Sequence, residues 1–397
     1  MRQFANERLM LPAVALASLG CLQPGIDPVF LTLLSSAHGL APELHGWVVS
    51  ATQTGMAAGA VVVWRWGTRL PEFGFVLAAL VASVAALATT QTGYLPALLA
   101  LRGLYGTAMG LLYTHAMSTA ATCRPHGAYG AVFLLQLVLS TVIALVLPAI
   151  ADFAGPKAAL AALALAPLSA LALAAWSARS AHRRVAHMPQ APATEQGDAG
   201  PRAWATAGAT LLFICATMMV WTFSGALAVG AGIPEDTIGT AVALGSLAGA
   251  ATALLVMREQ PLVPPPLTGL LAGLSLLGPI VATQGGAAPF IVAIVLLNIG
   301  STAIIVRSSG LASAASRGSL FRRFVACTHP LGMILGPLAG SVATTTFGHA
   351  GLLLAAIATI AAACLLLAAG QARSLPFRRR PKRQESLDEF LTYVQTS

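Results

Sequence analysis

Charged residues are scarce in this sequence: they make up 9% of its 397 positions, against about 25% in an average soluble protein. Hydrophobic residues make up 57%, and the mean hydropathy is +0.79. A water-soluble chain of this length could not bury so much apolar surface, which excludes a disordered protein and an ordinary cytosolic enzyme. The composition therefore predicts a protein that is solvated by lipid.

Cysteine is also sparse, with five residues scattered singly and no CxxC pair. This spacing predicts neither a disulfide framework nor a metal site. The HExxH and GxSxG motifs of hydrolases and the Walker motif of ATPases are missing from the sequence. We therefore expect no enzyme, no cofactor and no ATP-driven pump.

The net charge of +9 raises the question of a nucleic-acid partner. The cations, however, lie between apolar segments or near the ends of the chain rather than along one face. Cations in those places follow from the positive-inside rule of membrane insertion. We therefore expect the partner of the chain to be a lipid bilayer and not a nucleic acid.

A helix needs about 20 mostly apolar residues to cross a membrane, and the chain offers two sets of six such segments. The first set is expected at 10–35, 46–65, 72–91, 95–118, 128–151 and 156–177. The second set is expected at 204–230, 236–257, 264–284, 288–308, 324–347 and 350–370.

The distribution of charge predicts how these segments are oriented. If both termini are cytoplasmic, the inner loops and the two ends hold nearly all of the arginines, and the outer loops hold a single cation, Lys157. The acidic residues of the outer loops are Glu43, Asp152, Glu235 and Asp236. This asymmetry predicts a multi-pass protein of a bacterial cytoplasmic membrane with both termini inside.

The two sets of segments also resemble each other. Gly55-x-x-x-Gly59 in the second segment is matched by Gly245-x-x-x-Gly249 in the eighth. Such internal repeats are typical of carriers built from two related bundles. The sequence thus predicts an all-α membrane protein with twelve transmembrane helices in two pseudo-symmetric six-helix bundles. Its expected parts are an N-terminal bundle over 1–177, a cytoplasmic linker over 178–203, a C-terminal bundle over 204–371 and a basic cytoplasmic tail over 372–397.

Two motifs make the class more specific. The fourth segment carries an arginine followed four residues later by a glycine, Arg102 and Gly106. The eleventh segment carries G-x-x-x-G-P-x-x-G, whose fixed positions are Gly332, Gly336, Pro337 and Gly340. With these motifs the chain resembles the major facilitator superfamily of membrane transporters over residues 8–372. In that family the second motif is associated with antiporters and marks the fifth segment, the repeat partner of the eleventh.

The loop after the second segment carries a third, partial match. Arg65, Gly67 and Arg69 fit the loop pattern of the superfamily, whereas Trp64 stands where the pattern has an aspartate. The resemblance implies that these residues and the glycines of the two other motifs serve gating and helix packing. The charge-linked latch that the aspartate usually forms is not expected here.

Asp27 is the clearest acidic candidate for function, because a charge inside a membrane is costly and is rarely retained without a role. It lies in the first segment between Pro24 and Pro28, which are expected to break the helix there. A carboxyl group beside a broken helix could bind and release a proton. The alternative is a residue close to the outer surface and wetted by it.

Arg102 and His329 are further candidates for proton coupling. The resemblance implies that Arg102 acts in proton coupling or in binding an anionic group, with Asp27 as its candidate partner. Arginine keeps its own proton, so it would act by biasing a nearby carboxylate. Histidine titrates near neutral pH, and His329 could relay protons. The alternative roles are an arginine that bonds helix-end carbonyls and a histidine that packs in the core.

Polar and aromatic side chains within the segments are the candidate substrate ligands. They are Tyr105, Gln136, Trp221, Phe223 and Asn298. The aromatic residues could stack on an apolar ligand, and the amides could bind a polar one. Helix–helix contact is the alternative role for each of them.

These features favour a secondary transporter that moves a small molecule by alternating access. We expect a monomer that exports a metabolite, drug or siderophore in exchange for protons. A proton-coupled importer of a nutrient, organic anion or iron chelate is the alternative. A non-transporting membrane protein is a remote third.

Overall fold

The structure, a computed structural model, describes residues 2–40, 44–122, 125–185, 199–257, 262–282, 285–316 and 318–371. Throughout these ranges the chain is helical and has no strand, as the sequence predicts. The helices of the first half are α1 (Arg2–Gly20), α2 (Gln23–His38), α3 (His45–Trp66), α4 (Glu72–Thr89), α5 (Leu95–Ala120), α6 (Pro125–Ala154), α7 (Pro156–Ala162) and α8 (Leu165–Val185). Those of the second half are α9 (Pro201–Gly230), α10 (Glu235–Val256), α11 (Pro265–Ala282), α12 (Ala287–Ala314) and α13 (Ser319–Gln371).

Ten helical stretches in the described ranges are long and apolar enough to cross a membrane. One of them, α13, bends at Gly348, whose positive φ of 63° suits glycine, so its two arms correspond to the expected segments 324–347 and 350–370. Two shorter apolar stretches, Leu11–Gly20 and Val29–His38, lie in succession on α1 and α2. Together α1 and α2 supply the expected first segment, which completes the pattern of a twelve-helix membrane protein.

The first segment is broken, but slightly earlier than its prolines suggest. The chain leaves the helix at Cys21 and Leu22, and Pro24 then occupies the first turn of α2. A proline is tolerated there because the first turn has no intrahelical partner for its missing N–H. Pro28 lies further along, within the helix. The break therefore places Gln23 and Asp27 on the first turns of a new helix.

The polar stretch between the halves is partly helical. The sequence predicts a linker over 178–203, whereas α8 continues to Val185 and α9 begins at Pro201. Residues 186–198 and the basic tail from 372 lie outside the described residues.

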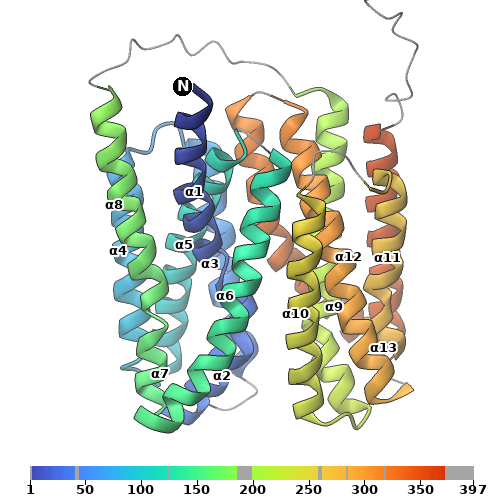
Figure 1. The fold of residues 1–397 in the computed structure, drawn as a ribbon. Coiled ribbons are helices and arrows are strands. Elements are labelled where there is room, and N and C mark those ends of the chain that lie inside the picture. The colour runs from blue at the N-terminus through green and yellow to red at the C-terminus, as the bar shows by residue number, and fades with distance from the viewer. Residues whose placement is uncertain are drawn as a thin grey trace, which may run out of the picture.

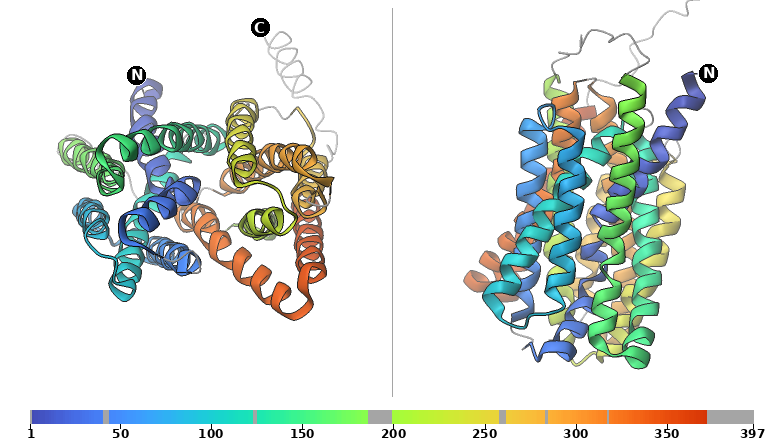
Figure 2. Two further views of the ribbon diagram at one scale, coloured as in Figure 1. Left: turned by 90° about the horizontal axis from the view of Figure 1, so that it is seen from below. Right: turned by 90° about the vertical axis from the view of Figure 1, so that its left-hand side faces the viewer.

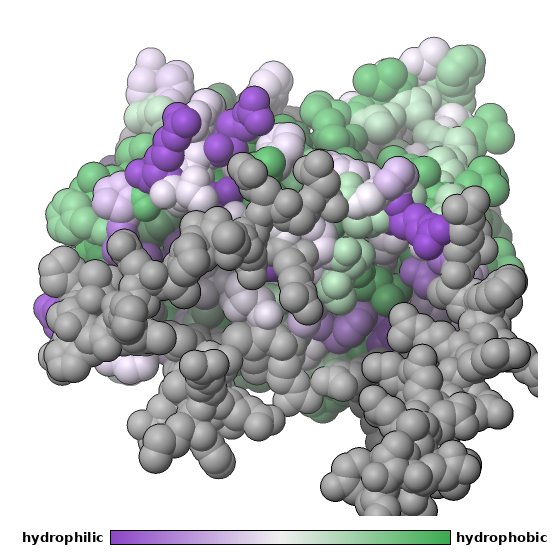
Figure 3. Space-filling view, turned by 90° about the horizontal axis from the view of Figure 1, so that it is seen from above, coloured by the Kyte–Doolittle hydropathy of each residue, from purple (hydrophilic) through white to green (hydrophobic). Residues whose placement is uncertain are grey.

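The helices form two groups that lie side by side (Figure 1). Seen end-on, α1 to α8 gather on one side and α9 to α13 on the other (Figure 2). We call the end that carries the start of α1, the α3–α4 turn and the start of α9 the linker end. Figure 3 shows this end, where hydrophilic residues lie among hydrophobic ones at the rim.

Glycines bring α3 and α5 into close contact. A Cβ atom at Gly106 would meet the carbonyl of Thr52, and one at Gly110 would meet that of Met56. From the other side, a Cβ at Gly55 would meet the carbonyl of Gly103. Small residues allow backbones to approach this closely in a membrane, where packing replaces the hydrophobic effect. The contact fixes the polar residues of α3 against those of α5.

This packing predicts the result of a matched pair of substitutions on α5. Gly106→Ala forces a methyl group against the Thr52 carbonyl, and we expect it to lower the free energy of unfolding by about 1–3 kcal/mol, the usual cost of overpacking. Gly103→Ala meets only the Ala51 carbonyl at 3.8 Å and should be neutral. Thermal unfolding of the purified protein in detergent checks both, and equal melting temperatures would contradict the close contact.

Candidate functional site

The Asp27 carboxyl group lies inside the first bundle rather than at its surface. Its side chain is 8% exposed, and Gln23, one turn earlier on α2, donates a hydrogen bond from Nε2 to Oδ1 at 2.7 Å. Gln53 of α3 lies close to the same carboxyl group. Two amide side chains from two helices therefore surround the one acidic group that the sequence places in a span.

The Arg102 guanidinium is held by aromatic rings and one hydroxyl. Its Cζ atom lies 4.4 Å from the centre of the Phe30 ring and 4.5 Å from that of Tyr105. Its Nε donates to the Thr52 Oγ1 at 3.1 Å, and that hydroxyl donates in turn to the Val48 carbonyl. Rings beside the planar cation attract it electrostatically, which lowers the cost of burying it.

Asp27 and Arg102 are neighbours without forming a close ion pair. Each influences the other electrostatically. Among the described residues, however, no nitrogen–oxygen contact within 4.0 Å joins the two groups. The carboxyl group accepts a hydrogen bond from Gln23 of α2, and the guanidinium donates one to Thr52 of α3. Protonation of Asp27 would therefore leave the hydrogen bond between Arg102 and Thr52 in place.

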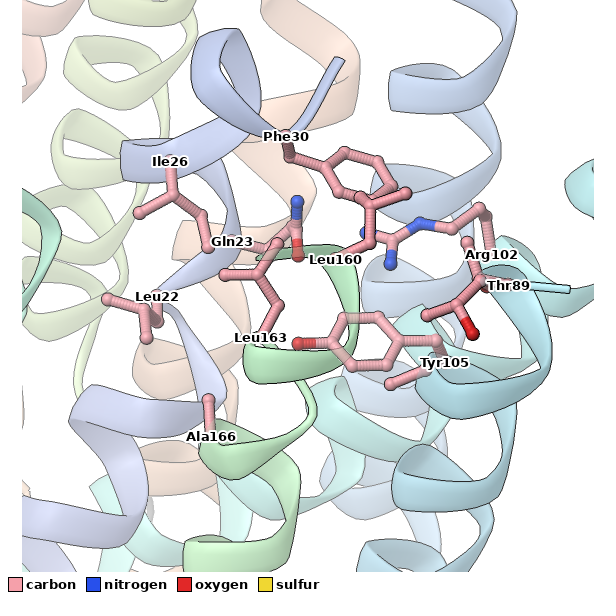
Figure 4. Close-up of a pocket in the computed structure, with 12 residues that line it drawn as sticks. Leu22, Gln23, Ile26, Phe30, Thr89, Arg102, Tyr105, Leu160, Leu163 and Ala166 are labelled. Carbon is pink, nitrogen blue, oxygen red and sulfur yellow. The ribbon is translucent and has the colours of Figure 1, made fainter. Parts of the chain in front are cut away.

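A small cavity lies beside Arg102, between α2, α4, α5, α7 and α8 (Figure 4). The Arg102 guanidinium, the Tyr105 hydroxyl and the Gln23 amide point toward its interior, and Leu160, Leu163 and Ala166 form the opposite wall. All of these helices belong to the first half. The cavity therefore lies within one bundle rather than between the two.

The two halves meet along a seam that begins at the linker end. There α6 packs against α10 and α12, and α13 packs against α3 and α5. The Ser313 Oγ donates to the Tyr129 hydroxyl at 3.4 Å across this seam. A Cβ at Gly130 would meet the Met257 side chain. Toward the opposite end the ribbons of α6 and α10 diverge (Figure 1).

The position of the missing aspartate is filled by an aromatic contact across the seam. The Trp64 ring of α3 lies 5.1 Å from the Phe324 ring of α13, which also packs on Trp204 of α9 at 4.8 Å. A Cβ at Gly67 would come within 2.9 Å of the Arg323 Nη1. The Arg323 cation thus reaches the C-terminal end of α3, which carries partial negative charge.

His329 lies in the middle of the seam, away from Asp27 and Arg102. Its ring contacts the Tyr113 ring at 5.8 Å and the Phe133 ring at 5.3 Å, both from the first half. Its Nδ1 is buried and has no hydrogen-bond partner among the described residues. The three candidates for proton coupling are therefore divided between one bundle and the seam.

The candidate substrate ligands are also not brought to one place. Tyr105 lies beside Arg102, and the Gln136 Oε1 accepts a hydrogen bond from the Cys21 Sγ at 3.4 Å. In the second half, the Asn298 Nδ2 donates to the Ile294 carbonyl of its own helix.

The other two candidates lie on α9. Trp221 and Phe223 are half-buried and pack against the apolar core of the second half. Phe223 also lies against Gly340 of α13.

The residues expected to serve gating and packing lie in two places, at the linker end and along the contact between α13 and α9. Arg65 and Arg69 are exposed at the linker end beside Gly67. Gly332, Gly336 and Gly340 all face α9, where a Cβ at Gly336 would meet the Cys215 carbonyl. Pro337 is half-buried on the same helix.

The residues around the two charges were not among the candidates predicted from the sequence. Thr52 accepts a hydrogen bond from Arg102, and Phe30 covers the guanidinium. Gln53 lies close to Asp27. A signal was present, because Thr52 and Gln53 are adjacent polar residues in an apolar segment, just before the first glycine of Gly55-x-x-x-Gly59. The Arg323 contact with α3 had no such signal, since it joins segments far apart in the sequence.

Comparison with known proteins identifies the fold as that of the major facilitator superfamily of transporters. No protein-family model matches the chain, and no curated protein matches its sequence. A bacterial homologue of the iron transporter ferroportin, in an outward-facing state, is 15% identical, with a TM-score of 0.67 over 93% of this chain and 99% of that one.

Two other transporters show the same likeness. FucP, a transporter of the superfamily in an outward conformation, is 14% identical, with a TM-score of 0.64 over 92% of this chain and 99% of its own. The human organic anion transporter MFSD10 is 13% identical, with a TM-score of 0.65 over 91% of this chain and 98% of its own. The resemblance inferred from the short motifs is thus confirmed at the level of the fold.

The ring contacts of Arg102 predict that replacing it with another cation lowers the stability of the protein. Arg102→Lys keeps the cation but loses the planar group that both rings contact, and we expect a loss of about 1–2 kcal/mol in the free energy of unfolding. Arg69→Lys, at an exposed position, is the control and should unfold like the parent. Thermal unfolding in detergent measures both; an Arg102→Lys variant as stable as the parent would argue against the ring contacts.

Proposed function

We propose that this chain is a secondary transporter that moves a small molecule across a bacterial cytoplasmic membrane by alternating access. The observation that carries the proposal is the seam between the halves, which is closed at the linker end while α6 and α10 diverge at the other. Two bundles in contact at one end are one of the two states that alternating access requires.

The charge distribution supports a cytoplasmic position for the linker end. The arginines that flank the spans are expected on that side, and both chain termini with them. With this orientation, the end at which the α6 and α10 ribbons diverge faces outward. The outward-facing states named for the ferroportin homologue and for FucP support the same interpretation.

Proton coupling is proposed for Asp27. The carboxyl group is buried in the first bundle, and the Arg102 guanidinium is its cationic neighbour. Gln23 and Gln53 can bind the group in either protonation state, because an amide both donates and accepts. A proton taken up by Asp27 would change the charge of the bundle by one unit and so bias its packing against the second half.

Export of a metabolite, drug or siderophore in exchange for protons is the direction we favour. It rests on the G-x-x-x-G-P-x-x-G motif, whose glycines join α13 to α9. Import of a nutrient, organic anion or iron chelate is the alternative, with Arg102 as the attraction for an anion. One structural neighbour is named as a homologue of an iron transporter and another as an organic anion transporter. The fold that they share therefore does not identify the substrate of this chain.

The transport function predicts a chemical difference between cells with and without the protein. In a strain that lacks the gene, an exported compound should be enriched in the cells and depleted in the medium by several-fold, and a plasmid copy should reverse both changes. Untargeted mass spectrometry of cells and medium measures this. Depletion in the cells would reverse the direction, and no change in metabolites or in a drug-susceptibility panel would contradict transport.

Asp27→Asn tests the coupling once a substrate is known. In proteoliposomes the variant should lose at least about ten-fold of the accumulation that a pH gradient drives, because the amide cannot carry the proton. Exchange of labelled for unlabelled substrate without a gradient should continue, since that step moves no net proton. Asp152→Asn, exposed at the opposite end from the linker, is the control. Full gradient-driven transport by the Asp27 variant would remove Asp27 from the mechanism.

A further inference from the structure

The cavity beside Arg102 has features that the transport proposal leaves unexplained. Arg102 is 2% exposed, yet its Nη2 is buried without a hydrogen-bond partner among the described residues. Arginine has five N–H donors, and a buried donor without an acceptor is costly. The ring contacts attract the charge but do not replace an acceptor in the guanidinium plane.

The charge beside the cavity is also incompletely balanced. Asp27 is the acidic group that acts on Arg102 electrostatically, but the two do not form a close ion pair. Tyr105, whose ring contacts the guanidinium, is neutral in its ordinary state. Whenever Asp27 holds a proton, the first bundle therefore has a net positive charge facing the cavity.

The size and lining of the cavity restrict what could provide the missing acceptor. Its volume is about 20 Å³, enough for a water molecule or a single monatomic ion and far below the roughly 300–1,000 Å³ of pockets for organic ligands. Apolar side chains make up most of the wall, with Thr89 and Thr90 at the end of α4. Both threonine hydroxyls already donate to backbone carbonyls of α4.

Three polar groups in the lining can still donate into the cavity. The Arg102 guanidinium and the Tyr105 hydroxyl both point toward it (Figure 4). The Gln23 Nε2 donates one of its two N–H groups to Asp27, which leaves the other available. Donors from Arg102, Tyr105 and Gln23, one of them cationic, in a mostly apolar lining match a small anion better than a cation.

We propose that this cavity is a binding site for a small monovalent anion of the size of chloride, held by Arg102 and Tyr105 within the first bundle. The site is separate from the space between the halves, where a transported molecule would bind. The proposal depends on neither the direction of transport nor the identity of the substrate. An anion there stabilises the bundle when Asp27 is protonated.

The test is the chloride dependence of thermal unfolding. The purified full-length protein is unfolded in detergent at constant ionic strength while sodium chloride replaces sodium gluconate. We expect the melting temperature to rise by a few degrees and to saturate, as for any ligand that binds only the folded state. The absence of a shift, which is the result for a cavity that holds only water, would overturn the proposal.

Two variants test whether the chloride-dependent shift of the melting temperature arises at Arg102. Arg102→Gln should abolish the chloride shift, whereas Arg323→Gln, which removes another buried arginine at the linker end, should retain it. Equal shifts in both variants would show that chloride acts elsewhere.

A second pair of variants covers the case in which Arg102→Gln does not fold. Ala166→Phe fills the cavity and keeps the arginine, so the shift should be lost. Leu168→Phe, on the exposed side of the same helix, should keep it. A chloride shift retained by Ala166→Phe would overturn the assignment to this cavity. Because the readout involves no transport, its failure is distinct from a failure of the transport proposal.

Discussion

The burial of the Arg102 charge is the constraint on which the first bundle depends. A cation inside a membrane protein must be compensated by its surroundings, at a cost that rises steeply if a partner is missing. Here the compensation comes from three helices: Phe30 of α2, Thr52 of α3 and Tyr105 of α5. Each of these contacts requires α2, α3 and α5 to stay in register.

The glycine packing of α3 against α5 provides that register. Because Gly106 lies against the Thr52 carbonyl, the hydroxyl of Thr52 is brought to the guanidinium one turn earlier on α5. The break between α1 and α2 has the same effect from the other side, since it places Phe30 and Asp27 on one short helix. The helix packing and the burial of the charge therefore depend on each other. A larger side chain at Gly106 should weaken the hydrogen bond between Arg102 and Thr52.

The sequence predicted the helices and the fold well, and the site only in part. Long apolar segments, charge asymmetry and repeated glycines are local patterns, and they were enough for a twelve-helix bundle. Asp27 and Arg102 stood out because charges are rare in spans. Their partners Gln53 and Phe30 did not, because an amide or a ring in a span has many possible roles. Which residues meet across the seam, as Trp64 and Phe324 do, depends on tertiary packing that no local pattern encodes.

The hydrogen bonds of Asp27 and Arg102 lie within the first bundle, whereas the ring contact of Trp64 with Phe324 joins the two halves. The contacts of Trp64 and Arg323 with their partners close the linker end without the aspartate that the superfamily pattern has. The proposed transport requires that the two ends of the molecule open in turn.

Pulsed electron paramagnetic resonance on the full-length protein in lipid nanodiscs measures this most directly. One pair of spin labels at the exposed positions Phe153 and Phe347 reports on the end opposite the linker. A second pair at Arg69 and Leu255 reports on the linker end. Between high and low pH, the account predicts that one distance shortens as the other lengthens. Distances at both ends that stay fixed, or that change in the same sense, would contradict alternating access.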